Sequence, residues 1–266
     1  MSKTTWRFVD GDWADGAYHM AVDEALLVLC AQERSPPTLR TYGFWPLCLS
    51  LGRFQSGQRE VNRDQCRMRG IDVVRRPTGG RAVLHQNDLA YSVVAPADEP
   101  HVGGRLRETY QRIALALAEA MRLLGAPAVA VNDGPGFVPA SGLCFQSLAP
   151  YDVTVAGAKV VGSAQVRRRG SILQHGSIRL MGGGHPLHRL MRLPLVVVRS
   201  QDSDVGLREL LGRRLTRRQV AAALQEAFAG VVGVELLPGG LTGEEEALAQ
   251  RLQKEKYANP AWNWIR

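Results

Sequence analysis

A chain of 266 residues, 45% hydrophobic and 22% charged, has an ordinary globular composition and is long enough to bury a large core. Its longest apolar runs, ALLVLCA and LPLVVV, fall far short of the ~20 residues that a membrane-spanning helix needs. Its N-terminus lacks the apolar segment of a signal peptide. We therefore expect a cytoplasmic protein that binds no membrane. The net charge of +8 is compatible with arginine-rich coding, with nucleic acid or with an acidic protein partner, and no nucleic-acid motif accompanies the scattered basic residues.

The first predicted element is a helix over residues 17–32, which Asp15 is placed to cap and the Ser-Pro-Pro sequence after it stops. Strand-like segments with short breaks follow at residues 38–44, 47–54, 71–77 and 82–96. A long amphipathic helix is then predicted over residues 105–125, with Gly125 at its end. Its apolar side chains recur at intervals of three or four: Leu106, Tyr110, Ile113, Leu117, Met121 and Leu124.

In the second half of the chain, the sequence pattern predicts a strand at residues 127–133 and two consecutive hairpins at residues 151–180. The hairpins turn at Ala156-Gly157 and at Arg169-Gly170. Two capping boxes start later helices: Thr216 with Gln219, and Thr242 with Glu245. Helices that stand between runs of strands, with hairpins present, favour an α+β domain with a mixed sheet.

Glycine clusters mark places where the backbone turns sharply or approaches something closely. They lie in the sequences PTGGRA, GPGFVPASG, VVGSAQ and MGGGHP. None has the GxxxxGK[ST] pattern of a phosphate-binding loop or the GxGxxG pattern of a dinucleotide-binding turn. Any nucleotide would therefore bind by another route.

The cysteines predict free thiols, because Cys30, Cys48, Cys66 and Cys144 form no CxxC pair and no regular framework. No Cys/His cluster has the spacing of a structural zinc site, and the pair in HPLH has no further ligands nearby. We expect neither a metal nor another cofactor.

Cys144, in ASGLCFQS, is either a buried thiol or a nucleophile, and a nucleophile needs a neighbour that favours the thiolate. Lys159 follows 15 positions later, across a strand and a tight turn, and His85 and His175 are competing partners. Only four of the 33 basic residues are lysines, and Lys159 alone lies away from the chain ends. The spacing does not choose among the three partners, but the choice of lysine over arginine marks this position.

A second candidate is RRPTGGRAVLH, read either as a turn between strands with solvated arginines or as a backbone cradle for a ligand. In the second reading Gly79 and Gly80 let the main chain approach the ligand, and Arg76 supplies a fixed positive charge.

The segments VVRRPTGGRAVLHQNDLAYSVV and GAKVVGSAQVRRRGSILQHGSI resemble the two signature regions of the lipoate–protein ligase and octanoyltransferase group, within the biotin/lipoate ligase superfamily. AYHMAVDEALL, PPTLRTYGFWPLCLSLGRFQ and KYANPAWN extend the resemblance over nearly the whole chain. It implies a mixed sheet with a smaller second sheet, flanked by helices. It also implies a single domain over residues 1–266, with the catalytic core at about 33–247 and no C-terminal accessory domain.

The resemblance implies that Lys159 contacts the acyl carbonyl and that Cys144 is the second catalytic residue. The substrate-binding residues that it implies come from the two signature regions: Arg76, Thr78, Gly79, Gly80, His85, Gly162, Ser163, Ala164, Gln165, His175 and Gly176. One departure is Gln86, which stands where many relatives have an acidic residue. It puts any role of that acid in doubt.

Three activities share these motifs: ATP-dependent lipoate ligation, octanoyl transfer from acyl carrier protein, and amidotransfer between lipoyl domains. The position of Cys144 and the absence of the Arg-Asn-Asp run of the ligases favour the octanoyltransferase. The expected partners are octanoyl-acyl carrier protein and a lipoyl-domain protein such as glycine cleavage H protein, with no nucleic acid. The alternatives are a ligase, an amidotransferase, or a non-catalytic module that binds an acyl group or nucleic acid.

Overall fold

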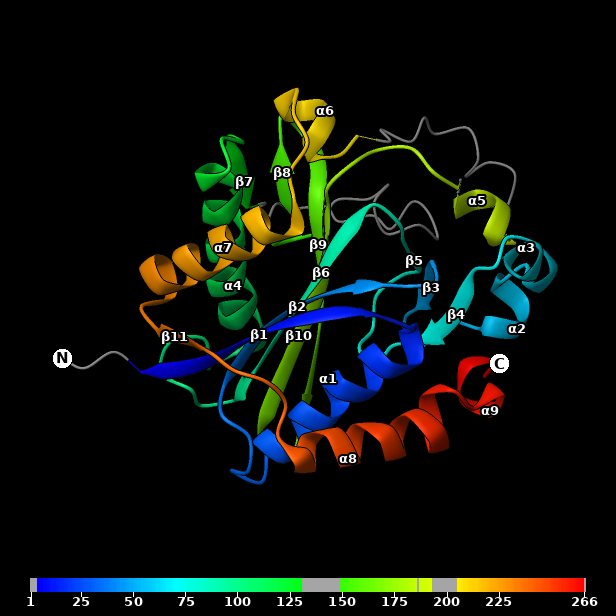
Figure 1. The fold of residues 1–266 in the computed structure, drawn as a ribbon, viewed down its shortest axis with the longest axis horizontal. Helices are drawn as coiled ribbons and strands as arrows, with labels where there is room; N and C mark the ends of the chain where they lie inside the picture. Colours follow the sequence, from blue (N-terminus) through cyan, green and yellow to red (C-terminus); the bar gives the residue numbers. More distant parts are fainter. Residues whose placement is uncertain (1–3, 131–148, 186, 193–204, 266) are drawn as a thin grey trace.

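The fold is built on a mixed sheet of eight strands, seen in a computed structural model that describes residues 4–130, 149–185, 187–192 and 205–265. Figure 1 shows the strands crossing the middle of the molecule. In spatial order they are β11 (Glu235–Pro238), β1 (Thr5–Ala14), β2 (Thr38–Phe44), β6 (Asp88–Pro96), β10 (Ser171–Arg179), β9 (Ala158–Arg168), β8 (Val153–Val155) and β7 (Ala128–Ala130). The first three run parallel and the remaining neighbours antiparallel.

A second sheet of three strands stands beside the large one. Its order is β4 (Asp72–Arg75), β3 (Cys48–Leu51) and β5 (Val83–His85), with β3 parallel to β4 and antiparallel to β5. The predicted α+β class, with a mixed sheet and a smaller second sheet, is confirmed.

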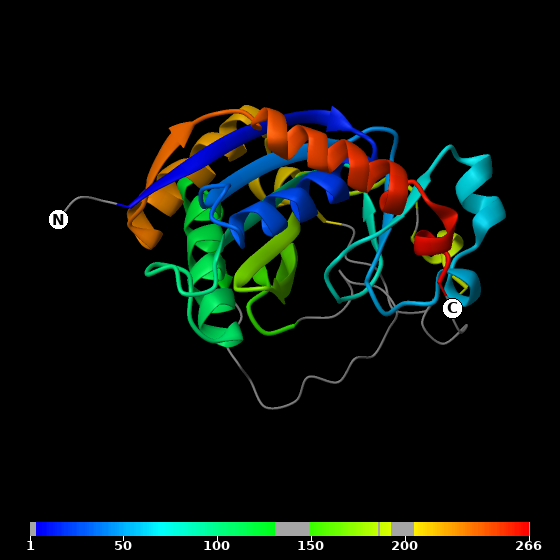
Figure 2. The ribbon, with the colours of Figure 1, turned by 90° about the horizontal axis from the view of Figure 1, so that it is seen from below.

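Helices cover both faces of the large sheet (Figure 2). α1 (Gly16–Cys30) and α8 (Gly243–Leu252) pack on one face, against Val94 and Leu173. α4 (Leu106–Leu123) and α7 (Arg217–Ala227) pack on the other face, against residues such as Val93 and Ile172. Neighbouring residues of β6 and β10 therefore point to opposite helix layers, as the two-residue period of a strand requires.

The remaining helices are short: α2 (Gly57–Glu60), α3 (Arg63–Met68), α5 (Leu187–Leu190), α6 (Leu207–Leu211) and α9 (Pro260–Asn263). Two π-helical turns, η2 (Phe228–Val232) and η3 (Gln253–Tyr257), continue α7 and α8. The C-terminal segment carries α9 to the small sheet, where it packs against β4 (Figure 1). Of the described helices, none has the length and apolarity to cross a membrane.

The predicted hairpins are confirmed, because Ala156-Gly157 and Arg169-Gly170 both have positive φ angles, 48° and 80° in the first pair and 51° and 87° in the second. This is the geometry of the tight turn that matches strand twist. The helix caps are confirmed too: Asp15 accepts from the backbone N–H of Tyr18, and both capping boxes form. The long helix ends as predicted, with Gly125 at φ +90°.

The strand-like segment predicted over residues 82–96 forms two strands, β5 and β6, which belong to different sheets. Asn87 adopts a φ of +57° between β5 and β6 and turns the chain from the small sheet into the large one. Asparagine tolerates this left-handed conformation, so the turn needs no glycine or proline. The sequence therefore lacks the residues by which such a turn is usually recognised. The sequence analysis also predicted neither β1 nor β11.

Candidate active site

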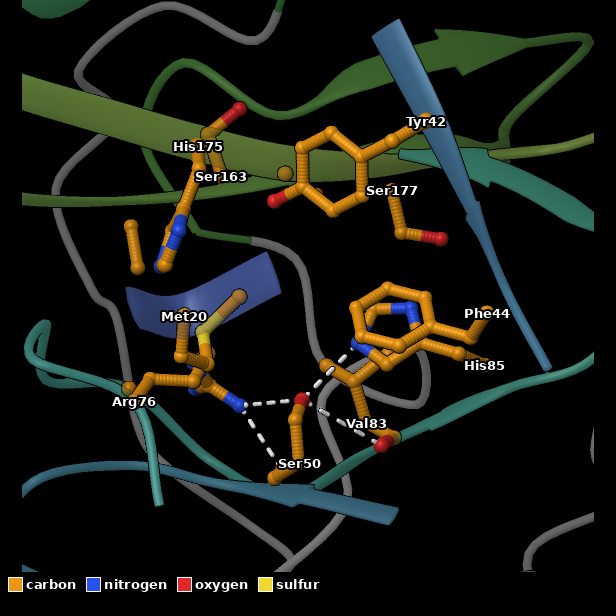
Figure 3. Close-up of a pocket in the computed structure, with 14 residues that line it drawn as sticks. Met20, Tyr42, Phe44, Ser50, Arg76, Val83, His85, Ser163, His175 and Ser177 are labelled. Atoms are coloured by element: carbon orange, nitrogen blue, oxygen red, sulfur yellow. Dashed lines mark hydrogen bonds between the residues drawn. The ribbon is translucent and has the colours of Figure 1, made fainter. Parts of the chain in front are cut away.

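A cavity between the two sheets holds the candidate site (Figure 3). It encloses about 430 Å³, open space at its mouth included, and most of its lining is apolar.

Eight of the sequence-predicted residues line this cavity: Arg76, Gly80, His85, Gly162, Ser163, Ala164, His175 and Gly176. Thr78, Gly79 and Gln165 lie in the same segments but outside the lining, and so does Lys159. Six lining residues were not predicted: Met20, Tyr42, Phe44, Ser50, Val83 and Ser177. The structure therefore brings both signature regions to one cavity, and α1, β2 and β3 complete its lining.

The second signature region reaches the cavity as the paired strands β9 and β10, in which Ser163 lies opposite Gly176 and Ala164 opposite His175. A Cβ on Gly176 would lie 2.3 Å from the carbonyl oxygen of Gly162 and 2.7 Å from the ring of Tyr91. Glycine at position 176 is therefore required for the close packing of this wall. Gln165, beyond the lining, donates to the side chain of Gln174 at 2.9 Å.

The first signature region runs from β4 through β5 into β6, and Arg76 holds together its turn between β4 and β5. Its guanidinium donates to the carbonyl oxygens of Ser50 at 2.8 Å, Gly79 at 3.0 Å and Arg81 at 2.9 Å. Gly52 packs so closely that a Cβ there would lie 1.8 Å from the Gly80 oxygen. The predicted turn thus exists, and the arginine expected to supply charge to a ligand also fixes the backbone of the cavity wall.

His85 is held by two partners, and they determine its tautomer. The carboxylate of Asp88 lies 2.7 Å from Nδ1, so Nδ1 carries the proton and Nε2 accepts from the hydroxyl of Ser50 at 2.9 Å. Arg76 donates to the same hydroxyl at 2.9 Å, and the ring of Phe44 stacks on the imidazole with 4.0 Å between centroids. Figure 3 shows Ser50 joined to both neighbours at the cavity wall.

His175 is held in the same way by Asp23, a residue of α1. Its Nδ1 lies 2.9 Å from the Asp23 carboxylate, so Nε2 accepts from the hydroxyl of Thr78 at 2.7 Å. Burial lowers the pKa of His175 and thereby favours the neutral ring. Burial alone raises the pKa of Asp23, but the hydrogen bond from His175 and the charge of Arg40 outweigh it, and the pKa lies below its usual value.

Lys159 does not line the cavity; it forms a buried ion pair with Asp152. Its Nζ lies 2.7 Å from Oδ2 of Asp152, and both side chains are 4% exposed. The same carboxylate oxygen accepts from the backbone N–H of Ala149 at 2.7 Å. Burial raises the pKa of Asp152, and the charge of Lys159 opposes that rise. Cys144 lies outside the described residues.

Gln86, where the resemblance led us to expect an acidic residue, binds the backbone of His185. Its side chain accepts from the backbone N–H of His185 at 2.8 Å and donates to the His185 carbonyl oxygen at 2.9 Å. An acidic side chain at this position has no donor for that carbonyl. Glutamine therefore has a structural use here.

The thiols other than Cys144 are poor nucleophiles. Cys30, Cys48 and Cys66 are free and buried. Burial raises the pKa of all three, to about 11 for Cys66 and well above the usual value for Cys48. Their free-thiol state is confirmed. The described residues contain no cluster of three His, Cys, Asp or Glu side chains that could hold a metal ion.

Comparison with known proteins identifies the family of this chain. The family model of the lipoyl protein ligase A/B catalytic domain matches residues 15–229, which include both signature regions. The chain belongs to this family. It is 39% identical over 270 residues to octanoyltransferase LipM of Moorella thermoacetica, with 98% of each chain covered. It is 36% identical over 278 residues to octanoyltransferase LipM of Bacillus subtilis, with 100% of each chain covered.

Solved structures of lipoyl protein ligases share the fold. A lipoate-protein ligase A bound with ATP superposes with a TM-score of 0.80 at 23% identity, over 98% of this chain and 99% of the other. A putative lipoate protein ligase of Thermoplasma acidophilum with bound lipoic acid gives 0.76 at 23% identity, over 99% of each. The predicted family, its fold and the enzyme class, an acyltransferase of the octanoyltransferase type, are confirmed.

A pH-dependent stability follows from the histidines behind the cavity. His19 donates through Nε2 to the Gly43 oxygen and accepts through Nδ1 from Arg40, both at 2.7 Å, and burial lowers its pKa to about 3. Below pH 6.5 the His19 side chain is protonated in the unfolded chain, whereas in the folded protein it stays neutral down to its lower pKa. Acid therefore favours unfolding. Between pH 7.5 and 4.5 this one group is expected to lower the free energy of unfolding by about 2–3 kcal/mol.

Urea unfolding at several pH values measures this effect. His19→Gln, which keeps polar atoms and does not titrate, is the control and should remove most of the slope that His19 contributes. The pKa of His175 is also lowered, so His175 contributes in the same direction. Part of the pH dependence of the unfolding free energy should therefore remain in the His19→Gln variant. A wild-type stability that is flat over this range would contradict the prediction.

Proposed function

We propose that this chain transfers an octanoyl group from octanoyl-acyl carrier protein to a lysine of a lipoyl-domain protein, such as glycine cleavage H protein, in the cytoplasm. The observation that carries the proposal is the 36–39% identity, over the full length, to proteins named octanoyltransferase LipM. The mostly apolar cavity supports it, because an acyl tail needs apolar surroundings near the reacting group. At about 0.8 kcal/mol per buried CH₂, an eight-carbon tail supplies several kcal/mol of binding.

The acyl carrier within the enzyme is proposed to be Cys144. The other three thiols are buried and have raised pKa values, so they are protonated near neutral pH. Cys144 is the remaining cysteine, and in the sequence it lies between the glycine-rich segment GPGFVPASG and the hairpin that carries Lys159.

The reaction then proceeds in two acyl transfers. The Cys144 thiolate attacks the thioester carbonyl of the carrier; the new C–S bond forms as the old one breaks, and the carrier thiolate leaves and takes up a proton. The amine of the acceptor lysine next attacks the Cys144 thioester, loses a proton and releases the thiolate. The first step exchanges one thioester for another, and the amide makes the second step downhill, so no ATP is consumed.

The chain's own residues position these steps in our proposal. Lys159 donates to the acyl oxygen, where negative charge develops. The backbone at Gly80 and along β9 and β10 lines the acyl chain. His85 and His175 hold this lining in place through their hydrogen bonds with Ser50 and Thr78. The whole chain acts as one domain, with the family core at about residues 33–247.

Cys144→Ala tests the proposal. Wild-type enzyme incubated with octanoyl-carrier protein, without ATP, should gain one octanoyl group by intact mass and lose it when a lipoyl domain is added. Cys144→Ala should form no adduct and transfer nothing, although it retains Cys30, Cys48 and Cys66. Full transfer by this variant would refute the covalent route, and activity that requires free octanoate and ATP would identify a ligase.

A further inference from the structure

An exposed aromatic side chain stands beside the cavity. Phe54, in the segment after β3, is 91% exposed and is the most exposed large hydrophobic residue in the described part of the chain. It lies at a hollow that also contains Arg53, Pro77, Arg168, Lys256 and Trp262, which we call the basic hollow. A protruding aromatic ring beside a concave surface is typical of a site that another protein covers.

The basic hollow carries an excess of positive charge. The guanidinium of Arg53 lies 4.3 Å from the centre of the Trp262 ring, and the ammonium of Lys256 lies 4.2 Å from it. Arg168 and Lys256 share one carboxylate, that of Glu24, at 2.6 and 2.5 Å. Two of the three cations lie against the Trp262 ring, and Glu24 offsets one charge, so the hollow keeps a net positive charge that matches a partner with an acidic surface.

The basic hollow and the acyl cavity are separated by a single turn of the chain. Pro77 belongs to the hollow and Gly80 to the cavity. A Cβ on Gly79, between them, would touch the ring of Phe54 at 3.9 Å. A protein seated on the hollow therefore stands next to the turn that lines the acyl chain.

The charge distinguishes between the two protein substrates of the proposed function. The donor, an acyl carrier protein, is acidic and holds its acyl group on an arm joined through a phosphodiester, which is an anion. The acceptor reaches the enzyme through a lysine side chain and has no anionic arm to match the cations beside the acyl cavity. We infer, on the basis of the proposed function, that the basic hollow is the docking site of the acyl carrier protein.

Charge reversal tests the docking site. The variants are Arg53→Glu, Arg53→Glu combined with Arg168→Glu, and Phe54→Ala. The first measurement is kcat/KM for adduct formation with octanoyl-carrier protein and with octanoyl-pantetheine, which has neither the protein nor the phosphate. We expect the double variant to lose at least about tenfold with the carrier protein and less than about twofold with octanoyl-pantetheine.

Arg218→Glu, an exposed residue of α7 on the other face of the large sheet, is the matched control and should keep both rates. Transfer from pre-acylated enzyme to the lipoyl domain should also be unchanged in all variants. The second measurement is the Kd of carrier protein that bears its arm without an acyl group, which should rise by a similar factor in the double variant.

Three results would overturn the inference: an unchanged Kd and rate with the carrier protein, an equal loss with octanoyl-pantetheine, or a loss confined to the transfer to the lipoyl domain. The last of these would place the acceptor on the hollow. The Kd does not depend on the chemistry, so it still tests docking if wild-type enzyme forms no adduct and the proposed function fails.

Discussion

Lys159→Arg is expected to slow the octanoylation of Cys144 by on the order of 10²–10³, nearly as much as Lys159→Ala, although it keeps the charge. Lys159 and Asp152 are each 4% exposed, with 2.7 Å between Nζ and Oδ2. A guanidinium is a planar fork with fixed donor directions and is larger than an ammonium. In this closed space it displaces either the carboxylate or the acyl oxygen that the ammonium is proposed to contact.

Single-turnover octanoylation, followed by intact mass, measures the loss. Lys254→Arg is the control, because Lys254 is exposed and lines neither the acyl cavity nor the basic hollow. It should keep most of the wild-type rate. Thermal melting separates lost activity from lost structure. A folded Lys159→Arg variant with more than about a third of the wild-type rate would show that the position needs only a cation.

The sequence identified Lys159 but could not identify its partner. The chain uses arginine almost everywhere, so a single interior lysine marks a position where the compact ammonium matters. Asp152 lies just before β8, and the pairing of β8 with β9 shifts register between Val153 and Thr154. This register shift determines which side chains face each other across the hairpin. The alternation of apolar and polar residues along a strand does not show where such a shift occurs.

The cavity wall was partly predictable for a similar reason. The glycine-rich signature regions lie in sequence patterns that resemble a family, so eight lining residues followed from the motifs. Tyr42, Phe44 and Ser50 lie on strands that were predicted, but their place at the cavity depends on how the two sheets pack. One signal was available and unused: Asp23 interrupts an apolar helix face, and a carboxylate on a buried face requires partners.

Asp23→Ala is expected to lower the free energy of unfolding by about 3–5 kcal/mol. Asp23 is fully buried, and its carboxylate accepts from Arg40 at 3.1 Å, Tyr42 at 2.9 Å, Ser92 at 2.8 Å and His175 at 2.9 Å. Removing it leaves the Arg40 charge, 2% exposed, without its carboxylate. An uncompensated buried cation costs more than the lost hydrogen bonds.

A double-mutant cycle with Arg40→Met separates the two costs. If the unpaired charge dominates, Asp23→Ala combined with Arg40→Met should be more stable than Asp23→Ala alone. Urea unfolding near pH 7 is the measurement, because the folded pKa of Asp23 lies below its usual value, so its contribution is complete above about pH 4 and is lost as the pH falls through the folded pKa. A single variant that loses less than about 1 kcal/mol would contradict the prediction. The double variant should also bind the acyl chain less tightly, since His175 then has no carboxylate to fix the tautomer that accepts from Thr78.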